Sequence, residues 1–117
     1  GDRIQAFNGW DTLTFVGIAL GAKASVWGMA GVTPELAVEL WNTLAVRKDV
    51  QAARDLWAKL WPIADWMESV NYVAGIKAGY ELVGAPAGPA RQPVLPLSAD
   101  ERATLKGHLE AAGVKTV

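Results

Sequence analysis

The first residues that could do chemistry lie in a predicted strand-to-helix turn near the start of the chain, Phe7-Asn8-Gly9-Trp10-Asp11. Asp11 is the carboxylate of this turn. It could hold a substrate hydroxyl, or it could cap the following helix by accepting from a backbone amide of Leu13 or Thr14. Gly9 could let the backbone approach a ligand, or could simply adopt a positive φ. Both interpretations fit the spacing of each residue.

A second turn of the same kind, Gly28-Met29-Ala30-Gly31, follows a second predicted strand. Gly28 and Gly31 carry the same two interpretations as Gly9. Trp10 and Trp27 each lie at a strand end beside one of the turns. In parallel α/β proteins such turns line the mouth where ligands bind, so either ring could touch a ligand.

The usual catalytic motifs are absent: the sequence has no Walker loop, GxGxxG, HExxH or GxSxG. His108 is the only histidine, and without partners for a metal or a triad it is predicted to be a surface or structural residue. Lys77 is predicted to be solvated or ion-paired, because nothing in the sequence lowers its pKa enough for Schiff-base chemistry.

The elements that position the two turns form a βαβ pattern. Strands are predicted over residues 3–7 and 22–27, with a helix over residues 10–20 between them. Gly17 should weaken that helix unless close packing requires the missing side chain, and Gly21 should end it. A βαβ unit needs parallel neighbours, and two strands alone do not make a stable sheet, so further strands are expected elsewhere.

The rest of the chain is predicted to be helical. Thr33-Pro34 should start a helix that ends near Arg47, and Asp49 should cap a long amphipathic helix bent at Pro62. That helix could pack on its neighbours or, as a minor alternative, pair in a coiled coil. Two more helices are predicted after caps at Asn71 and Ser98, with a proline-rich connector between them. The tryptophans that fall on the helices are expected in the core or a subunit interface: Trp41, Trp57, Trp61 and Trp66.

Composition bounds the class of protein. The 117 residues are 51% hydrophobic and 20% charged, which indicates one modest globular domain rather than a disordered chain. Eleven basic and 12 acidic residues give a net charge of −1, so neither nucleic acid nor an anionic membrane is expected as a partner. The absence of cysteine permits a cytoplasmic location. A chain that starts at Gly1 and enters a strand at once is expected to be a piece of a longer protein.

Taken in order, these segments resemble the C-terminal part of the dihydrodipicolinate synthase and N-acetylneuraminate lyase family. The stretch from Phe7 to Asp11 resembles the turn after the family's strand seven, and Gly21 to Val26 resembles its strand eight. Further matching segments cover nearly all of the remaining chain: Gly31-Val32-Thr33-Pro34, Asp49 to Pro62, Ile76-Lys77, Leu82-Val83-Gly84 and Arg91 to Leu97.

The resemblance implies a fold class and a chemistry. The fold is α/β: the last two βα units of a (β/α)8 TIM barrel over residues 1–47, followed by a helical region over residues 48–117. The activity is that of a class I lyase or aldolase, in which a lysine forms a Schiff base with pyruvate and a tyrosine relays protons. Both residues lie on strands five and six, outside this chain, since Lys23 and Lys77 match other positions. No cofactor and no metal is implied.

The resemblance also implies a substrate-binding set: Gly9, Asp11, Thr12, Trp27 and Gly28. Thr12 stands where neuraminate lyases have an acidic residue, which argues against sialic acid. Trp27 and Met29 make the pocket wall bulkier than usual and favour an apolar aldehyde as the partner of pyruvate. The whole enzyme is expected to be a homo-oligomer, and the fragment alone to be inactive. The alternative is a stand-alone helical remnant that only associates with itself or another protein.

Overall fold

A computed structural model describes residues 3–117, which form two compact units that divide between Trp61 and Pro62. The first unit contains both strands, α1, α2 and the first part of α3. The second contains the rest of α3, with α4 and α5. Each unit is described by itself. The division at residues 47 and 48 predicted from the sequence concerns where barrel units end, and it stays a prediction.

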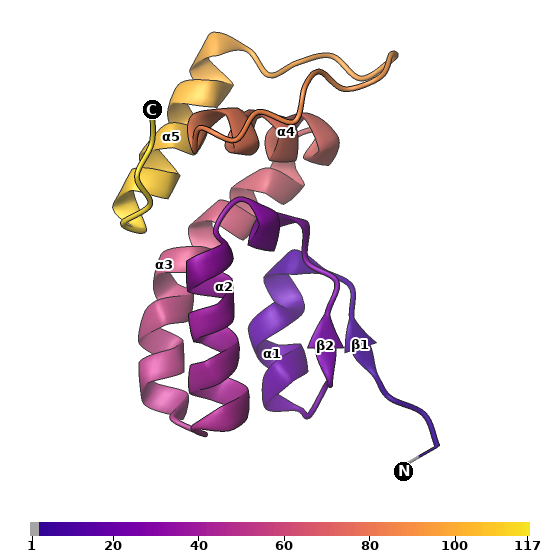
Figure 1. Ribbon diagram of the computed structural model, residues 1–117, viewed down its shortest axis with the longest axis vertical. Coiled ribbons are helices and arrows are strands. Elements are labelled where there is room, and N and C mark those ends of the chain that lie inside the picture. Colours follow the sequence, from indigo (N-terminus) through magenta and orange to yellow (C-terminus); the bar gives the residue numbers. More distant parts are fainter. Residues whose placement is uncertain (1–2) are drawn as a thin grey trace. The chain divides into compact units, whose positions relative to one another are not determined.

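The first unit is built on a βαβ unit (Figure 1). Strands β1 (Phe7–Asn8) and β2 (Ala24–Ser25) are parallel neighbours, with Phe7 opposite Ala24 and Asn8 opposite Ser25. A 3₁₀ turn (Asp11–Leu13) and helix α1 (Thr14–Ala19) connect them. Gly21, with φ of +96°, ends this segment as expected, because only glycine adopts that conformation without strain.

Both strands are shorter than the predicted ranges of residues 3–7 and 22–27. Only one further hydrogen bond extends the pairing at each end, from the Lys23 amide to the Ala6 carbonyl and from the Val26 amide to the Asn8 carbonyl. Within residues 3–117 no third strand pairs with either edge, so the flanking residues lack the partners that would make them ladder residues. The predicted helix from Trp10 likewise begins as a 3₁₀ turn, and α-helix starts only at Thr14.

Helix α2 (Pro34–Trp41) starts where Thr33-Pro34 predicted, with Pro34 in its first turn. It continues as a π-helical turn (Asn42–Val46) before Arg47. Thr33 stands at the N-cap position, but its side chain does not accept from a helix amide; its hydroxyl donates to the Met29 carbonyl, at 3.2 Å. Because that carbonyl lies one turn upstream, the hydroxyl fixes the chain entering the helix instead of its first amides.

Helix α3 (Val50–Ser69) is capped by Asp49, whose carboxylate accepts from the Ala52 amide at 3.0 Å. Pro62 lies inside this helix, and the predicted bend there stays a prediction. In the second unit, α4 (Tyr72–Leu82) is capped by Asn71 and α5 (Ala99–Ala111) by the predicted capping box of Ser98 and Glu101. Among the described residues, 83–98 hold neither helix nor strand.

Each unit has its own buried apolar residues. In the first unit they come from α1, the second turn, α2 and its π-helical end, and α3: Ile18, Met29, Val32, Leu40, Leu44, Ala53 and Leu60. In the second they come from all three helical segments and the C-terminal turn: Ile63, Ala64, Met67, Ala74, Ala78, Leu82, Leu105, Leu109 and Ala112. By contrast, large apolar side chains of the βαβ unit are exposed, among them Phe7 at 59% and Val26 at 69%.

Candidate functional site

The two turns meet at one end of the sheet, because parallel strands present their carboxyl ends on the same side. Asp11, in the first turn, is 6% exposed, whereas Gly9 is exposed and Thr12 is half-buried. The second turn is a 3₁₀ segment (Gly28–Gly31), in which Gly28 is half-buried and Met29 is fully buried. Four of the five predicted site residues, Gly9, Asp11, Thr12 and Gly28, therefore belong to two neighbouring turns.

A hydrogen bond joins these turns. The Met29 amide donates to Oδ2 of Asp11 at 3.2 Å, and the two residues are 18 positions apart in the sequence. This contact is buried, so water does not compete for either atom. Sequence reasoning found Asp11 but missed this partner, because a backbone amide donor has no residue-type signature.

Asn8 forms a second connection just beneath the turns. Its Nδ2 lies within hydrogen-bond distance of the Trp10 carbonyl (2.7 Å), Thr14 Oγ1 (3.2 Å) and Ser25 Oγ (2.8 Å). The Thr14 and Ser25 hydroxyls also hydrogen-bond each other at 3.1 Å. One amide group thus ties β1 to the first turn, to α1 and to β2. The sequence signal for it was a polar residue at the carboxyl end of each short strand, Asn8 in β1 and Ser25 in β2.

Trp27, the fifth predicted site residue, packs on the helix side of β2. Its ring lies 6.2 Å from that of Trp57 on α3, and Trp57 stacks in turn on Phe15 of α1 at 6.2 Å. Ser25 and Trp27 lie on the same side of the strand, since side chains alternate, and Val26 points the other way. The prediction that Trp27 touches a ligand stays a prediction.

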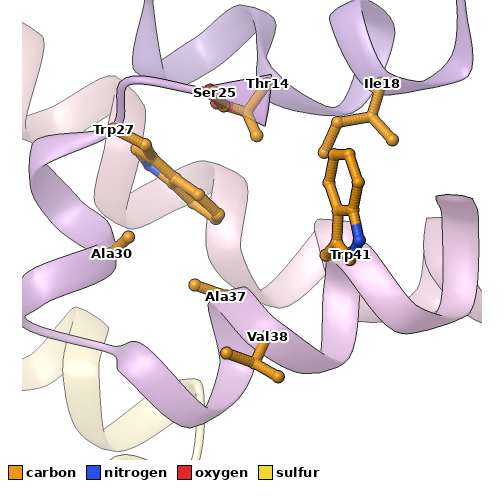
Figure 2. A pocket seen from close by; sticks show the side chains of 8 residues that line it. All are labelled: Thr14, Ile18, Ser25, Trp27, Ala30, Ala37, Val38 and Trp41. Carbon is orange, nitrogen blue, oxygen red and sulfur yellow. The ribbon is translucent and has the colours of Figure 1, made fainter. Parts of the chain in front are cut away.

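A cavity of about 220 Å³ lies next to the Trp27 ring (Figure 2). Trp27 and Trp41 stand on two sides of it, and it lies among α1, β2 and α2. Its only polar side-chain groups apart from the indoles are the Thr14 and Ser25 hydroxyls, and both are engaged with Asn8. Trp27 Nε1 is buried and has no hydrogen-bond partner among the described residues. The lining is: Thr14, Ile18, Ser25, Trp27, Ala30, Ala37, Val38 and Trp41.

The remaining candidates have local roles in the second unit. Nζ of Lys77 donates to the Ala87 carbonyl at 2.8 Å in an exposed contact, which is compatible with the expected solvated side chain. His108 is half-buried beside Trp66, with ring centroids 6.3 Å apart. Across residues 3–117, no group of three or more histidine or acidic side chains is arranged to hold a metal ion. In the same part of the chain, every helix is too short or too polar to cross a bilayer.

Strand, turn and helix repeated in parallel define βα units of the kind that build α/β barrels, with candidate ligand-binding turns at the carboxyl ends of the strands. The family model described as Dihydrodipicolinate synthetase family matches residues 1–112. This chain belongs to that family.

Named relatives agree with the assignment. The chain is 30% identical over 112 residues to the 4-hydroxy-tetrahydrodipicolinate synthase of Methanocaldococcus jannaschii, covering 96% of this chain and 38% of the relative. It is 32% identical over 114 residues to the 2-dehydro-3-deoxy-D-gluconate/2-dehydro-3-deoxy-phosphogluconate aldolase of Thermoproteus tenax, covering 94% and 36%. The chain therefore spans well under half the length of the curated relatives that it matches.

The solved structures give the same proportion. A dihydrodipicolinate synthase from Acinetobacter baumannii, inhibited by chloride and complexed with pyruvate, superposes with a TM-score of 0.82 at 25% identity. The match covers 95% of this chain and 38% of that one. The fold of the chain thus matches (β/α)8-barrel synthases over about two fifths of their length, which fits its mostly helical content.

Proposed function

We propose that this chain is the C-terminal part of a dihydrodipicolinate synthase-like, Schiff-base-forming lyase or aldolase that uses pyruvate. The observation that carries the proposal is the family match over residues 1–112, combined with coverage of only 38% of the first relative. Residues 1–47 supply the last two βα units of a barrel, and residues 48–117 supply the C-terminal helical region.

The substrates are pyruvate and an aldehyde. Support for pyruvate comes from the Acinetobacter synthase, which was solved with pyruvate bound. Support for a carbon–carbon lyase comes from the Thermoproteus aldolase. In this proposal the Schiff-base lysine and the proton-relay tyrosine lie outside the chain, on barrel strands that the 117 residues do not include. The chain needs no cofactor of its own.

The substrate site in this proposal comprises Gly9, Asp11, Thr12, Trp27 and Gly28, and buried Asp11 contributes to it through its hydrogen bond to the second turn. Gly9 and Gly28 bring backbone close to the substrate, and Thr12 offers a hydroxyl from the first turn. Trp27 contributes through its place at the end of β2, because its ring is occupied by Trp57. The preference for an apolar aldehyde expected from the bulk of Trp27 and Met29 is not part of this proposal, because the Met29 side chain is fully buried and the Trp27 ring packs on Trp57.

The exposed apolar side chains of the βαβ unit support the same proposal. Phe7 and Val26 extend from paired strands whose outer edges have no partner among the described residues. Parallel sheets are normally buried on both faces, and more strands would bury these side chains. The complete enzyme is a cytoplasmic homo-oligomer in this proposal. The alternative, a helical oligomerisation remnant without catalysis, leaves the match of both βα turns to a lyase family unexplained.

Covalent trapping tests the proposal. The purified 117-residue chain is incubated with pyruvate and borohydride, and its intact mass is measured. We expect no adduct and no retro-aldol activity, because the attacking lysine is outside the chain. An adduct on the chain alone would overturn the assignment of that lysine to the missing strands.

The complementary arm uses a chimera in which the unmatched N-terminal part of the Methanocaldococcus synthase precedes this chain. We expect borohydride to fix one reduced pyruvyl group to the N-terminal part. The unmodified Methanocaldococcus synthase serves as the positive control. A folded chimera, as judged by circular dichroism, that gains no mass while the control does would count against the proposal.

A further inference from the structure

Met29 is fixed in the second turn both by burial of its side chain and by hydrogen bonds of its backbone. Its side chain is fully buried, and its amide donates to Asp11 Oδ2 at 3.2 Å. Its carbonyl lies within hydrogen-bond distance of the Val32 amide (2.9 Å), the Thr33 amide (3.0 Å) and the Thr33 hydroxyl (3.2 Å). Both backbone polar groups of Met29 are therefore engaged, and one of them depends on a side chain from the other turn.

These contacts form a continuous path from the first turn to α2. Asp11, 6% exposed, holds Met29, and Met29 accepts from Thr33, which is 1% exposed and directly precedes Pro34. Asn8 fixes the other side of the first turn through the Trp10 carbonyl. The second turn is thus supported by the Asp11 carboxylate, which belongs to the turn after β1.

We propose that Asp11 is a positioning residue that holds the Gly28–Gly31 turn against the turn after β1. Its Oδ2 acts on the Met29 amide, and its effect on substrate passes through the backbone of the second turn. The inference deepens the proposed function and rests on it only for the claim that this turn borders the substrate. The bond between the two turns is independent of any activity.

A buried carboxylate suits this task. A hydrogen bond to an ionised acceptor is stronger than one to a neutral acceptor, and its removal leaves the donor desolvated and unpaired. In an Asp11→Ala variant the Met29 amide keeps its buried position but loses its acceptor. An Asp11→Asn variant keeps an oxygen of the same reach. Asp11→Asn should therefore rescue the position of the turn, whereas Asp11→Ala should release it.

The test is residue-resolved amide hydrogen exchange on the 117-residue chain. We expect exchange at Met29 to speed up by about tenfold or more in Asp11→Ala, and by much less in Asp11→Asn. Asp49→Ala is the matched control: it removes a carboxylate that accepts from the Ala52 amide and should speed exchange there, not at Met29. Unchanged Met29 exchange in folded Asp11→Ala would overturn the proposal. If Asp11→Ala does not fold, Asp11→Asn decides, because a neutral oxygen is the weaker acceptor: faster exchange at Met29 with unchanged exchange at Ala52 supports the proposal, and unchanged exchange at Met29 overturns it.

A kinetic readout separates positioning from direct substrate contact in an active chimera of the kind described above. A positioning role predicts that Asp11→Ala lowers kcat by the same factor with hydroxylated and hydroxyl-free aldehydes, with activity restored in Asp11→Asn. A loss confined to the hydroxylated aldehyde would overturn the inference. Hydrogen exchange on the chain alone requires no activity. If Asp11→Ala speeds exchange at Met29 but the chimera forms no pyruvate adduct, the proposed function has failed and the positioning role of Asp11 stands.

Discussion

Gly17 on α1 lies directly against Asn8 on β1: a Cβ built on Gly17 would stand 2.9 Å from the Asn8 Cβ and 3.4 Å from its Cγ. The Cβ of Asn8 is attached to the strand backbone and cannot swing away. A glycine is otherwise costly inside a helix, because it loses more backbone entropy than alanine on folding. Here the absence of a side chain lets the helix approach the strand closely enough for Asn8 to reach Thr14 and Ser25.

Gly17→Ala should therefore destabilise the chain, although alanine is the better helix former. The expected loss is about 1–3 kcal/mol from overpacking, against a gain of about 1 kcal/mol in helix propensity. Gly107→Ala is the matched control, since Gly107 lies in α5 with no atom within 4 Å of an added Cβ. That change should stabilise the chain by up to about 1 kcal/mol. Urea unfolding measures both, and equal signs for the two variants would contradict the packing argument.

Trp57 should be more costly to remove from α3 than Trp61. Its ring contacts both Phe15 and Trp27, whereas Trp61, four residues later on the same helix, is 43% exposed. Trp57→Ala should cost about 3 kcal/mol, and Trp61→Ala about 1 kcal/mol or less. Thermal unfolding compares the two variants. A larger loss from Trp61→Ala would mean that the Phe15–Trp57–Trp27 cluster does not organise the first unit.

Asn8 and Ser25 should be energetically coupled. Each single change to alanine removes the bond across the strands and leaves a partly buried partner unsatisfied, at a cost of about 1–2 kcal/mol. The double variant should lose less than the sum of the two, with a coupling energy of about 0.5–1.5 kcal/mol in a double-mutant cycle. Asn71→Ala, which removes a cap in the second unit, combined with Ser25→Ala provides an additive control. If the losses from the Asn8 and Ser25 changes simply add, the hydrogen bond from the Asn8 amide to the Ser25 hydroxyl does not couple the two strands.

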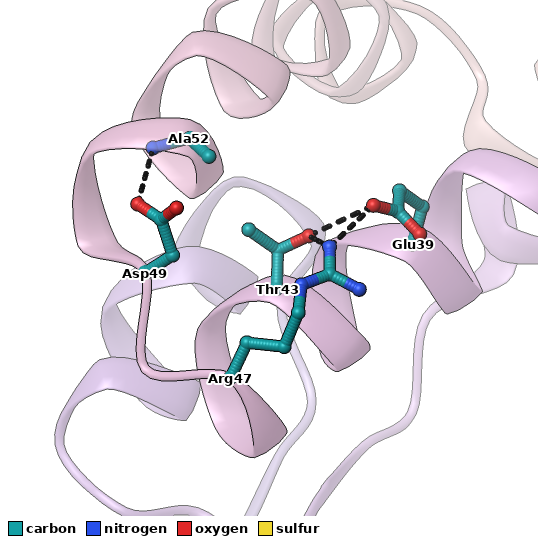
Figure 3. A network of polar contacts seen from close by, with 5 residues as sticks. All are labelled: Glu39, Thr43, Arg47, Asp49 and Ala52. Atoms are coloured by element: carbon teal, nitrogen blue, oxygen red, sulfur yellow. Dashed lines mark hydrogen bonds and ion pairs between the residues drawn. The ribbon is translucent and has the colours of Figure 1, made fainter.

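Glu39 should make part of the stability of the first unit sensitive to acid (Figure 3). Hydrogen bonds from the Arg47 guanidinium and the Thr43 hydroxyl hold the pKa of Glu39 below its ordinary value of 4.5. A carboxylate with a lowered pKa stabilises the fold above its unfolded pKa, and this contribution is lost as pH falls through the folded pKa. Glu39→Gln should remove this contribution to the pH dependence of the unfolding free energy below about pH 4.5. The change should have little effect on packing.

The control for Glu39 is Asp65→Asn, which changes the net charge equally at an exposed position on α3. Urea unfolding at a series of pH values between neutrality and acid compares the two variants with the parent chain. A Glu39→Gln profile that runs parallel to the parent at all pH values would contradict the assigned pKa shift. Because Glu39 and Arg47 are both about half exposed, high salt should reduce the difference.

The helix ends that carry a local capping residue were the part of the fold that the sequence predicted well. Asp49, Asn71 and the Ser98–Glu101 capping box all make the expected contacts, and Gly21 adopts a positive φ after α1 as expected. These signals are local: a cap needs only its own side chain and an amide two or three residues away. Strand lengths were overestimated, because a ladder also needs neighbours that no local pattern reveals.

The candidate site was predicted in outline. The two turns were found from strand-stop-helix patterns, and the structure brings Asp11 to the second turn. What joins them could not be predicted, since the Met29 amide is a backbone group and its partner is 18 residues away. The sequence placed the Trp27 side chain in the pocket wall and did not predict its contact with Trp57 on α3, because one residue of register decides which face a side chain takes.

The hydrogen bonds that tie the βαβ unit and its two turns together are short in sequence, and this has a kinetic consequence. Asn8 reaches Ser25 across 17 positions, and Asp11 reaches Met29 across 18. Closing loops of that length costs little entropy, and folding rates rise as contacts become more local. The βαβ unit with its two linked turns is therefore expected to assemble as an early cooperative step, before any further strand is recruited to its open edges. Pulse-labelled exchange during refolding would detect that step as early protection of the amides of Val26 and Met29.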